Sequence, residues 1–333
     1  MSGSQSPLAP IALFVFNRPD LLVNAVDSLL KNPLCADSDL YVFSDAPRAN
    51  RPDDDVKVAA VRGYIRGITG FKTVHIEHRE SNLGARMNIR MGIDSVLRSY
   101  DRVIALEDDL LVASNFIDYM NGALDFYISI ERVWCINGCS LNEKYLSLPE
   151  SWPDDVYFVP RNNSYGWGIW KNRWEQVDFD LKRQWRAFRS RGARERLARA
   201  GADLTDMLRD AAIGRVDAWD VSVTASIVAH NGLCVTPVHS FVAAQSSAAG
   251  THVTSADDRV AHNLGHPKWP LRFSENIRYA PDIERAFLQV YRVPRRTLKG
   301  NLLEAGSLLK WYCKAGMQGL RRSVAGRVTQ FRG

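Results

Sequence analysis

Three acidic residues in succession, Glu107, Asp108 and Asp109, directly follow the apolar segment 103–106. Neighbouring carboxylates repel one another when ionised, and this repulsion raises their pKa values. A bound divalent cation would remove that cost. Hard oxygen ligands suit Mg²⁺ or Mn²⁺, especially where diphosphate oxygens complete the coordination shell. The alternative is a solvated acidic turn at the start of the next helix. The apolar segment before the triplet, and a second acid, Asp45, after another such segment, favour the metal site.

Two further aspartates, Asp217 and Asp220, lie at the predicted start of a helix that runs from Trp219 to His230. A carboxylate that faces a sugar can take the proton of an acceptor hydroxyl and so act as a general base. Acids also stabilise helix N-termini through the helix dipole, which is the competing explanation. One of the two can cap the helix while the other acts as the base, so both remain candidates.

Four single residues have candidate binding roles. The Asp45 carboxylate could accept the imide N–H of uracil, although aspartate before a proline is also common in turns. His252 is a candidate ligand of a metal or a phosphate, although a lone histidine is more often structural. Trp167 lies in an aromatic cluster of the kind usually found in cores, but tryptophan rings also stack on sugar faces. Trp167 is therefore a candidate platform for the acceptor or the donor, and we assign it, with Trp219, to acceptor binding.

The first half of the chain alternates apolar segments with segments of helical periodicity. The predicted strands are 11–16, 40–43, 74–76 and 103–106. The continuous apolar run 11–16 indicates a strand buried on both faces, and 74–76 is a shorter strand. Each strand is followed by a predicted helix, the last with Ser114 as its N-cap. This order predicts an α/β fold with a doubly wound, mostly parallel sheet. In such sheets ligands bind beyond the C-terminal ends of the strands, where Asn17, Arg18, Asp45 and the acidic triplet fall.

The second half has a mixed pattern. Segments 133–136, 156–159 and 233–237 are predicted strands, Gly166-Trp-Gly168 is predicted to lead into an aromatic helix, and 181–200 reads as one exposed, arginine-rich helix. We divide the chain into a Rossmann-like half, 8–132, a mixed half of the same domain, 133–285, and a basic amphipathic tail, 286–333.

Charge is unevenly distributed along the chain. The formal net charge is +6, but residues 290–333 contain ten Lys or Arg and one acid, Glu304, so this segment carries +9 and the rest −3. The tail's leucines and aromatics, interleaved with basic residues, are typical of an interfacial helix on an anionic membrane. The alternatives are a solvated helix that packs on its own domain and a nucleic-acid contact, which we do not expect.

We see no signal peptide, in which a positively charged region is followed by an apolar one. The longest early apolar run is far below the roughly 20 residues that span a bilayer. Five scattered cysteines are typical of reduced thiols. We therefore expect a cytoplasmic protein whose tail gives it access to the inner face of the cytoplasmic membrane.

Several short motifs, in this order and spacing, carry a family resemblance: residues 9–19, Phe43-Ser-Asp-Ala-Pro47, Asn82-Leu-Gly84 and Leu106-Glu-Asp-Asp-Leu110. They resemble a bacterial glycosyltransferase of the GT-A fold and are similar to eukaryotic N-acetylglucosaminyltransferase I, which carries the same Glu-Asp-Asp form of the metal motif. The resemblance continues through Gly166–Lys171, Asp217–Asp220 and Gly250–His252. The basic tail is not part of it.

The resemblance implies a metal-dependent, inverting transfer of a sugar from a nucleotide-diphosphate donor, a UDP-sugar, to a hydroxyl of a glycan or lipid-linked glycan in surface polysaccharide or lipopolysaccharide synthesis. It implies that Arg18 and Asp45 hold the uridine end of the donor, with Asn17 and Asn82 also assigned to the donor. Glu107 and Asp108 would line the ribose and diphosphate. Asp109, with His252, would bind Mn²⁺ or Mg²⁺, and Asp220 would be the base, with Asp217 as the alternative.

Two other classes of protein remain as rivals. A sugar-nucleotide nucleotidyltransferase would share the sheet and the metal, but it normally needs a glycine-rich loop after the first strand. Here Phe16-Asn-Arg-Pro19 contains no glycine. An inactive sugar-binding module is the second rival, and the complete set of acids argues against it.

Overall fold

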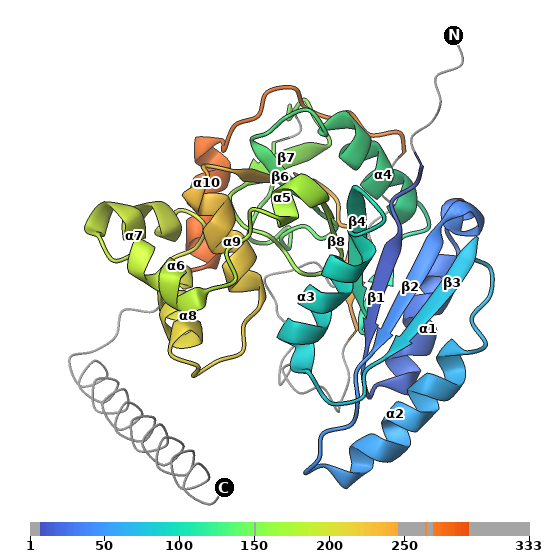
Figure 1. Ribbon diagram of the computed structural model, residues 1–333. Helices are drawn as coiled ribbons and strands as arrows, with labels where there is room; N and C mark the ends of the chain where they lie inside the picture. Colours follow the sequence, from blue (N-terminus) through green and yellow to red (C-terminus); the bar gives the residue numbers. More distant parts are fainter. Residues whose placement is uncertain (1–6, 150, 246–263, 265–268, 293–333) are drawn as a thin grey trace, which may run out of the picture. The chain divides into compact units, whose positions relative to one another are not determined.

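The computed structural model describes residues 7–149, 151–245, 264 and 269–292 (Figure 1). These residues lie within one compact unit that extends from Met1 to Arg292. The last described helix, α10 (Pro281–Val290), crosses the predicted boundary at residue 285 and buries Ile283 and Phe287 in this unit. His252 and most of the predicted tail lie outside the described residues.

An eight-stranded sheet forms the centre of the fold, with the strand order β3-β2-β1-β4-β8-β6-β9-β7. Its strands are β1 (Ile11–Val15), β2 (Asp39–Ser44), β3 (Thr73–His78), β4 (Arg102–Glu107), β6 (Val133–Asn137), β7 (Val156–Val159), β8 (Trp167–Trp170) and β9 (Leu233–Pro237). The first four strands in this order are parallel, whereas β8 runs antiparallel to both β4 and β6. This confirms the predicted α/β fold with a mostly parallel half and a mixed half. A second small sheet pairs β5 (Leu110–Val112) with β10 (Val242–Ala244).

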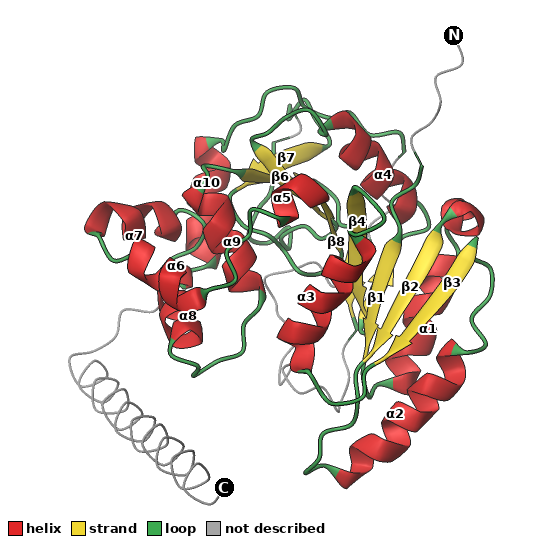
Figure 2. Cartoon of the chain, in the orientation of Figure 1, coloured by secondary structure: helices red, strands yellow, loops and turns green. Residues whose placement is uncertain are grey.

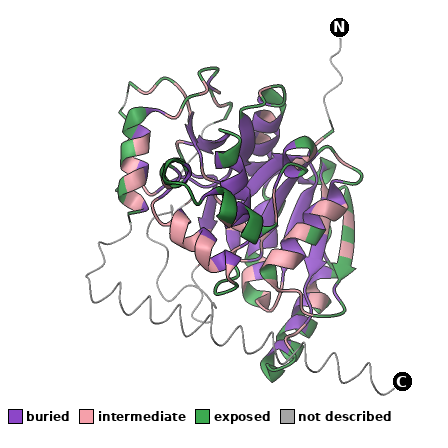
Figure 3. Ribbon diagram, turned by 60° about the vertical axis from the view of Figure 1, so that its left-hand side comes forward, coloured by how far each residue is buried: buried purple, intermediate pink, exposed green. Residues whose placement is uncertain are grey.

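Helices cover both faces of the sheet (Figure 2). Besides α10 they are α1 (Pro19–Leu30), α2 (Pro52–Ile65), α3 (Gly84–Val96), α4 (Phe116–Phe126), α5 (Lys171–Trp174), α6 (Leu181–Ala187), α7 (Arg191–Ala198), α8 (Leu204–Ala212) and α9 (Asp220–Ala229), with the 3₁₀ turn η1 (Pro33–Asp37). Because side chains alternate along a strand, Leu13 and Phe14 of β1 point to opposite faces. Leu13 joins the apolar cluster that contains residues of α1, α2 and α4, and Phe14 joins the cluster that contains residues of α3, α9 and α10. Figure 3 shows that the central strands are almost entirely buried between these layers.

The predicted positions of the first four strands and of β6, β7, β9 and α9 are confirmed to within one or two residues. The aromatic segment after Gly166 differs from the prediction, because Trp167–Trp170 is a strand and only the following turn is helical. Gly166 adopts φ +65, which turns the chain into the sheet. A four-residue apolar run contains too little periodicity to distinguish a buried strand from a buried helix.

Two predicted helix features are also corrected. The N-cap of α4 is Asn115 rather than Ser114, and it makes no capping hydrogen bond through its side chain. The predicted single helix 181–200 is two helices, and Ser190 caps the second by accepting from the backbone N–H of Ala193. Serine at a break between helices favours this cap, because its hydroxyl satisfies a free N–H of the first turn.

Close packing of α3 on the sheet gives the first testable prediction. A Cβ added at Gly92 would lie 2.5 Å from Cε1 of Phe14 and 2.9 Å from Cδ2 of Phe43. Gly92→Ala should therefore lower the free energy of unfolding, measured in urea, by about 1–3 kcal/mol.

The matched control is Gly63→Ala in α2, where the added Cβ meets nothing within 4 Å. This variant should gain about 0.5–1 kcal/mol, because alanine loses less backbone entropy than glycine in a helix. Equal effects of the two substitutions would contradict the packing described for α3.

Candidate functional site

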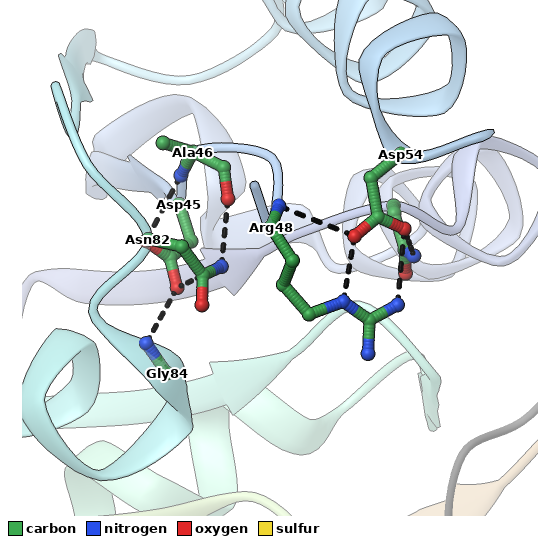
Figure 4. A network of polar contacts seen from close by, with 7 residues as sticks. Asp45, Ala46, Arg48, Asp54, Asn82 and Gly84 are labelled. Carbon is green, nitrogen blue, oxygen red and sulfur yellow. Dashed lines mark hydrogen bonds and ion pairs between the residues drawn. The ribbon is translucent and has the colours of Figure 1, made fainter. Parts of the chain in front are cut away.

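Asp45 joins the end of β2 to the start of α3 (Figure 4). Its Oδ1 accepts from the backbone N–H groups of Ala46 and Leu83, at 2.9 Å each, and its Oδ2 accepts from the N–H of Gly84 at 3.0 Å and from Nδ2 of Asn82 at 3.2 Å. Two donors on each oxygen fill most of the acceptor capacity of a carboxylate. Asp45 and Asn82 therefore meet at the predicted edge, where they fix the backbone. A contact from Asp45 to a base stays a prediction, and it would have to share an oxygen with one of these donors.

A second polar network, around Arg48 and Asp54, lies beside the first (Figure 4), and Asn17 joins it. Nδ2 of Asn17 donates to Oδ1 of Asp54 at 2.7 Å, and Arg48 donates to both oxygens of the same carboxylate at 2.6 and 3.0 Å. The hydrogen bonds from Arg48 lower the pKa of Asp54 to about 2. The network ties the loop after β1 to the first turn of α2. Arg48 and Asp54 were not among the predicted site residues, although the acidic first turn of α2 was an available signal for Asp54.

Arg18 lies between two members of the acidic triplet. Its Nη1 donates to Oδ2 of Asp109 at 2.5 Å, and its Nη2 forms an ion pair with Oδ1 of Asp108. The other oxygen of Asp108 accepts from the backbone N–H of Phe16 at 3.0 Å. Asp108 is completely buried, whereas a quarter of the Arg18 side chain is exposed. The end of β1 thus supplies both a backbone donor and a cation to the end of β4.

The triplet carries more negative charge than Arg18 balances. Burial above all, together with the neighbouring charges of Asp109, Asp108 and Asp220, raises the pKa of Glu107 to about 8, against the lowering effect of Arg18. Burial also raises the pKa of Asp108 to about 6, against the lowering effect of Arg18. Two carboxyl groups with raised pKa values in one site indicate that additional positive charge would be bound favourably.

The carboxylate oxygens of the acidic triplet fit a hard cation whose other coordination positions are filled by a bound ligand. Among the described residues, no group of three or more His, Cys, Asp and Glu side chains is placed to hold a metal by itself. Oδ1 of Asp108 touches Arg18 but accepts no well-aligned hydrogen bond, and Asp109 is 24% exposed. A carboxylate open to solvent suits a metal whose remaining ligands are phosphate oxygens and water. The second predicted ligand, His252, lies outside the described residues.

Asp220 and Asp217 occupy different surroundings. Asp220 is the first residue of α9, and its charge acts on Glu107, so the structure brings it to the acidic triplet. Burial raises the pKa of Asp220, and Arg161 opposes that effect. Asp217 is 58% exposed and pairs with Nε of Arg86 at 2.7 Å. Of the two candidate bases, Asp220 is the one that lies beside the other acids.

Arg161 is a site residue that the sequence analysis missed. Its guanidinium donates to both carboxylate oxygens of Asp203, at 2.8 and 3.1 Å, and lies 4.0 Å from the ring centre of Tyr291. Only 11% of its side chain is exposed. Its electrostatic partners include Asp220. No local pattern could reveal this group, because Arg161, Asp203 and Tyr291 come from three distant segments.

The two tryptophans assigned to acceptor binding lie in the core, which corrects that prediction. Trp167 is 1% exposed and Trp219 is 9% exposed, and their ring centres are 5.6 Å apart. Trp167 also packs against Trp174, with ring centres 6.1 Å apart. The position of Trp167 on β8, inside the sheet, leaves neither of its ring faces open to a sugar.

Sequence comparison gives one family match. A model described as the GNT-I family matches residues 1–197, more than half of the 333-residue chain. The matched part contains Arg18, Asp45 and the acidic triplet, and it ends before Asp220. No curated protein matches the chain.

Three solved structures are similar at low sequence identity. The crystal structure of GalNAc-T7 with UDP, GalNAc and Mn²⁺ is 13% identical with a TM-score of 0.44, over 75% of this chain and 47% of that chain. S. aureus TarS 1–349 is 10% identical with a TM-score of 0.39, over 71% and 60%. The mannosyltransferase PcManGT from Pyrobaculum calidifontis, in complex with GDP-Man and Mn²⁺, is 14% identical with a TM-score of 0.37, over 69% and 72%. The chain therefore spans about half the length of the first of these.

The raised pKa of Glu107 predicts a pH dependence of stability. Between its ordinary value of 4.5 and its folded value of about 8, the folded state binds more protons than the unfolded state. The contribution of Glu107 to stability is therefore present at low pH and is lost as the pH rises through this window. We expect urea unfolding of the metal-free protein in EDTA to show this decline, and we expect Glu107→Gln to reduce its slope.

The control is Glu175→Gln, which removes an exposed acid and should leave the slope unchanged. A Glu107→Gln protein that keeps the full slope would show that another group causes the decline.

Proposed function

The chain belongs to the GNT-I family, a family of glycosyltransferases with the GT-A fold, and on that basis we propose that it moves a sugar from a nucleotide-diphosphate donor to a hydroxyl of a glycan acceptor. The observation that carries the proposal is the meeting of the acidic triplet, Arg18 and Asp220 at one edge of the sheet. This edge lies beyond the C-terminal ends of β1 and β4, where ligands of such sheets bind.

The donor is proposed to be a UDP-sugar, held by residues at or after the ends of the four strands β1, β2, β3 and β4. Arg18 supplies a guanidinium that is a quarter exposed and already oriented by two carboxylates. Such a planar, charged donor suits a diphosphate or a base carbonyl. Asn17, Asp45 and Asn82 line the uridine side, with Glu107 and Asp108 near the ribose and diphosphate.

Asp109 is the proposed protein ligand of Mn²⁺ or Mg²⁺, together with His252. The bound ion would supply positive charge that stabilises the diphosphate leaving group. The protein's own part is to keep Asp109 in place, which it does through the ion pairs of Arg18 with Asp108 and Asp109.

Asp220 is the proposed general base of a single inverting displacement. Its carboxylate takes the proton of the acceptor hydroxyl, whose oxygen forms the new bond to the anomeric carbon as the bond from that carbon to the diphosphate oxygen breaks. Arg161 favours the ionised form of Asp220 and so keeps it able to accept that proton. Burial acts in the opposite direction and makes the carboxylate a stronger base.

The acceptor is proposed to be a glycan or lipid-linked glycan in surface polysaccharide or lipopolysaccharide synthesis. Among the described residues, no helix has both the length and the hydrophobicity of a membrane-spanning segment. The membrane role of the tail stays a prediction, since 293–333 lie outside the described residues.

Two variants separate the candidate bases. Asp220→Asn should lower kcat by about 10²–10⁴-fold and leave donor affinity within a few fold, because the amide cannot accept the proton. Asp217→Asn should break only the exposed pair with Arg86. Steady-state kinetics and donor titrations measure both effects. A loss of rate in Asp217→Asn alone would assign the base to Asp217.

Donor binding tests the proposed function directly. Calorimetry with UDP-sugars and GDP-sugars, each with Mn²⁺ and with EDTA, should show metal-dependent binding of one UDP-sugar. Asp109→Ala should abolish the metal dependence, because it removes the proposed protein ligand, whereas Glu175→Ala, an exposed substitution, should not.

A folded protein that binds no nucleotide sugar would instead support the inactive-module alternative. Binding of a nucleoside triphosphate together with a sugar phosphate would support a nucleotidyltransferase.

A further inference from the structure

Helices α6 and α7, with the turn between them, present a group of exposed cations that we call the basic face. It consists of Lys182, Arg186, Arg189, Arg194 and Arg196. None of the five side chains has a hydrogen-bond or ion-pair partner among the described residues. The other arginines of the segment do have partners, since Arg183 pairs with Asp178, Arg191 with Glu195, and Arg199 with Glu284.

The basic face is a local concentration of charge rather than a general property of the chain. Residues 181–199 contain eight Lys or Arg and one acid, Glu195, a net +7 against +6 for the whole chain. Since residues 290–333 carry +9, all remaining residues together carry −10. Residues 181–199 are thus strongly basic, whereas the residues outside this segment and the tail are acidic in sum.

Folding does not explain this concentration. The helical layer is held by its own apolar cluster, which includes Leu181, Phe188, Leu197, Leu204 and Leu208 and reaches Val221 and Ala225 of α9. Five like charges without partners repel one another and oppose compaction. Their clustering is therefore better explained by an anionic partner.

The chemistry of the basic face points to lipid headgroups. Glycans and single-stranded nucleic acids are usually bound with aromatic rings that stack on the sugar or base. Here Phe188 is buried, and Trp185 is half-buried against the apolar cluster. Lys182 and Arg186 are four residues apart, which places them on one side of α6, and Arg189 lies in the turn that follows this helix. Diffuse charge without stacking surfaces suits the phosphates of a bilayer.

We propose that the basic face of α6 and α7 docks the protein on an anionic lipid bilayer. In Figure 1, α9 lies between this helical layer and the sheet, and its first residue is Asp220. Docking would therefore hold the bilayer on the side of the molecule that carries the proposed base. Only this last step, access to a lipid-linked acceptor, rests on the proposed function. The docking itself does not.

The test is sedimentation of the full chain with vesicles of phosphatidylcholine, with and without phosphatidylglycerol. The wild type should bind only the anionic vesicles, and more weakly as salt is raised. In R186Q/R189Q/R194Q we expect about fivefold weaker partitioning for each arginine removed, or about a hundredfold in all.

The matched control is K57Q/R66Q/R98Q, which removes the same net charge from exposed positions elsewhere on the body. It should change partitioning by no more than a few fold, and circular dichroism should show both variants folded. Equal losses in the two variants, or wild-type binding by R186Q/R189Q/R194Q, would overturn the proposal. So would binding of an anionic polysaccharide or nucleic acid through these arginines when anionic vesicles are not bound. Donor calorimetry on R186Q/R189Q/R194Q keeps this result separate from the proposed function, since donor binding should be unchanged.

Discussion

Three carboxyl groups cannot share the end of one buried strand unless positive charge lies beside them. Arg18 provides that charge, through its contacts with Asp108 and Asp109, and the backbone N–H of Phe16 holds the second oxygen of Asp108. Both groups come from the end of β1, which pairs in parallel with β4. The register of these two strands therefore decides whether the acids are stabilised, and the packing of α1 and α3 on either face maintains that register. The negative charge that Arg18 leaves unbalanced favours the binding of a cation at this site.

The mixed half of the sheet completes this edge by a different route. Antiparallel β8 lies between β4 and β6, and its tryptophans fill the interior beside Trp219. That packing fixes the residue before Asp220 and so places the start of α9 against the triplet. The aromatic residues that looked like a sugar platform thus serve the chemistry indirectly, because they position the carboxylate that follows them. Asp45 has a comparable role on the other side, where three hydrogen bonds tie the start of α3 to the end of β2.

Most of the parallel half could be predicted because β1, β2 and β4 each contain a continuous apolar run that is followed by polar residues. The position of the acidic triplet follows from that pattern alone, and the choice of Asp220 came from the family resemblance. The sequence did not reveal β8, because four apolar residues fit a strand or a helix equally well. Nor did it reveal the burial of Trp167, which depends on a strand being inserted beside β4. Arg161 was missed because its partners, Asp203 and Tyr291, are remote in sequence, and the satisfied state of Asp45 depends on backbone groups that no side-chain pattern encodes.

The arrangement around Arg161 has a consequence for biosynthesis. Gly201 has φ +132, and a Cβ added there would lie only 2.4 Å from Nη1 of Arg161, so the absence of a side chain leaves room for the guanidinium. Tyr291 packs over the same guanidinium. Because Tyr291 packs on Arg161 and the charge of Arg161 acts on Asp220, the environment of Asp220 depends on Tyr291. Tyr291 leaves the ribosome about seventy residues after Asp220. A nascent chain can form the parallel half and its acidic triplet early, but its proposed base reaches its final electrostatic surroundings only when α10 has folded back. Translation order thus separates the assembly of the donor side from that of the proton acceptor.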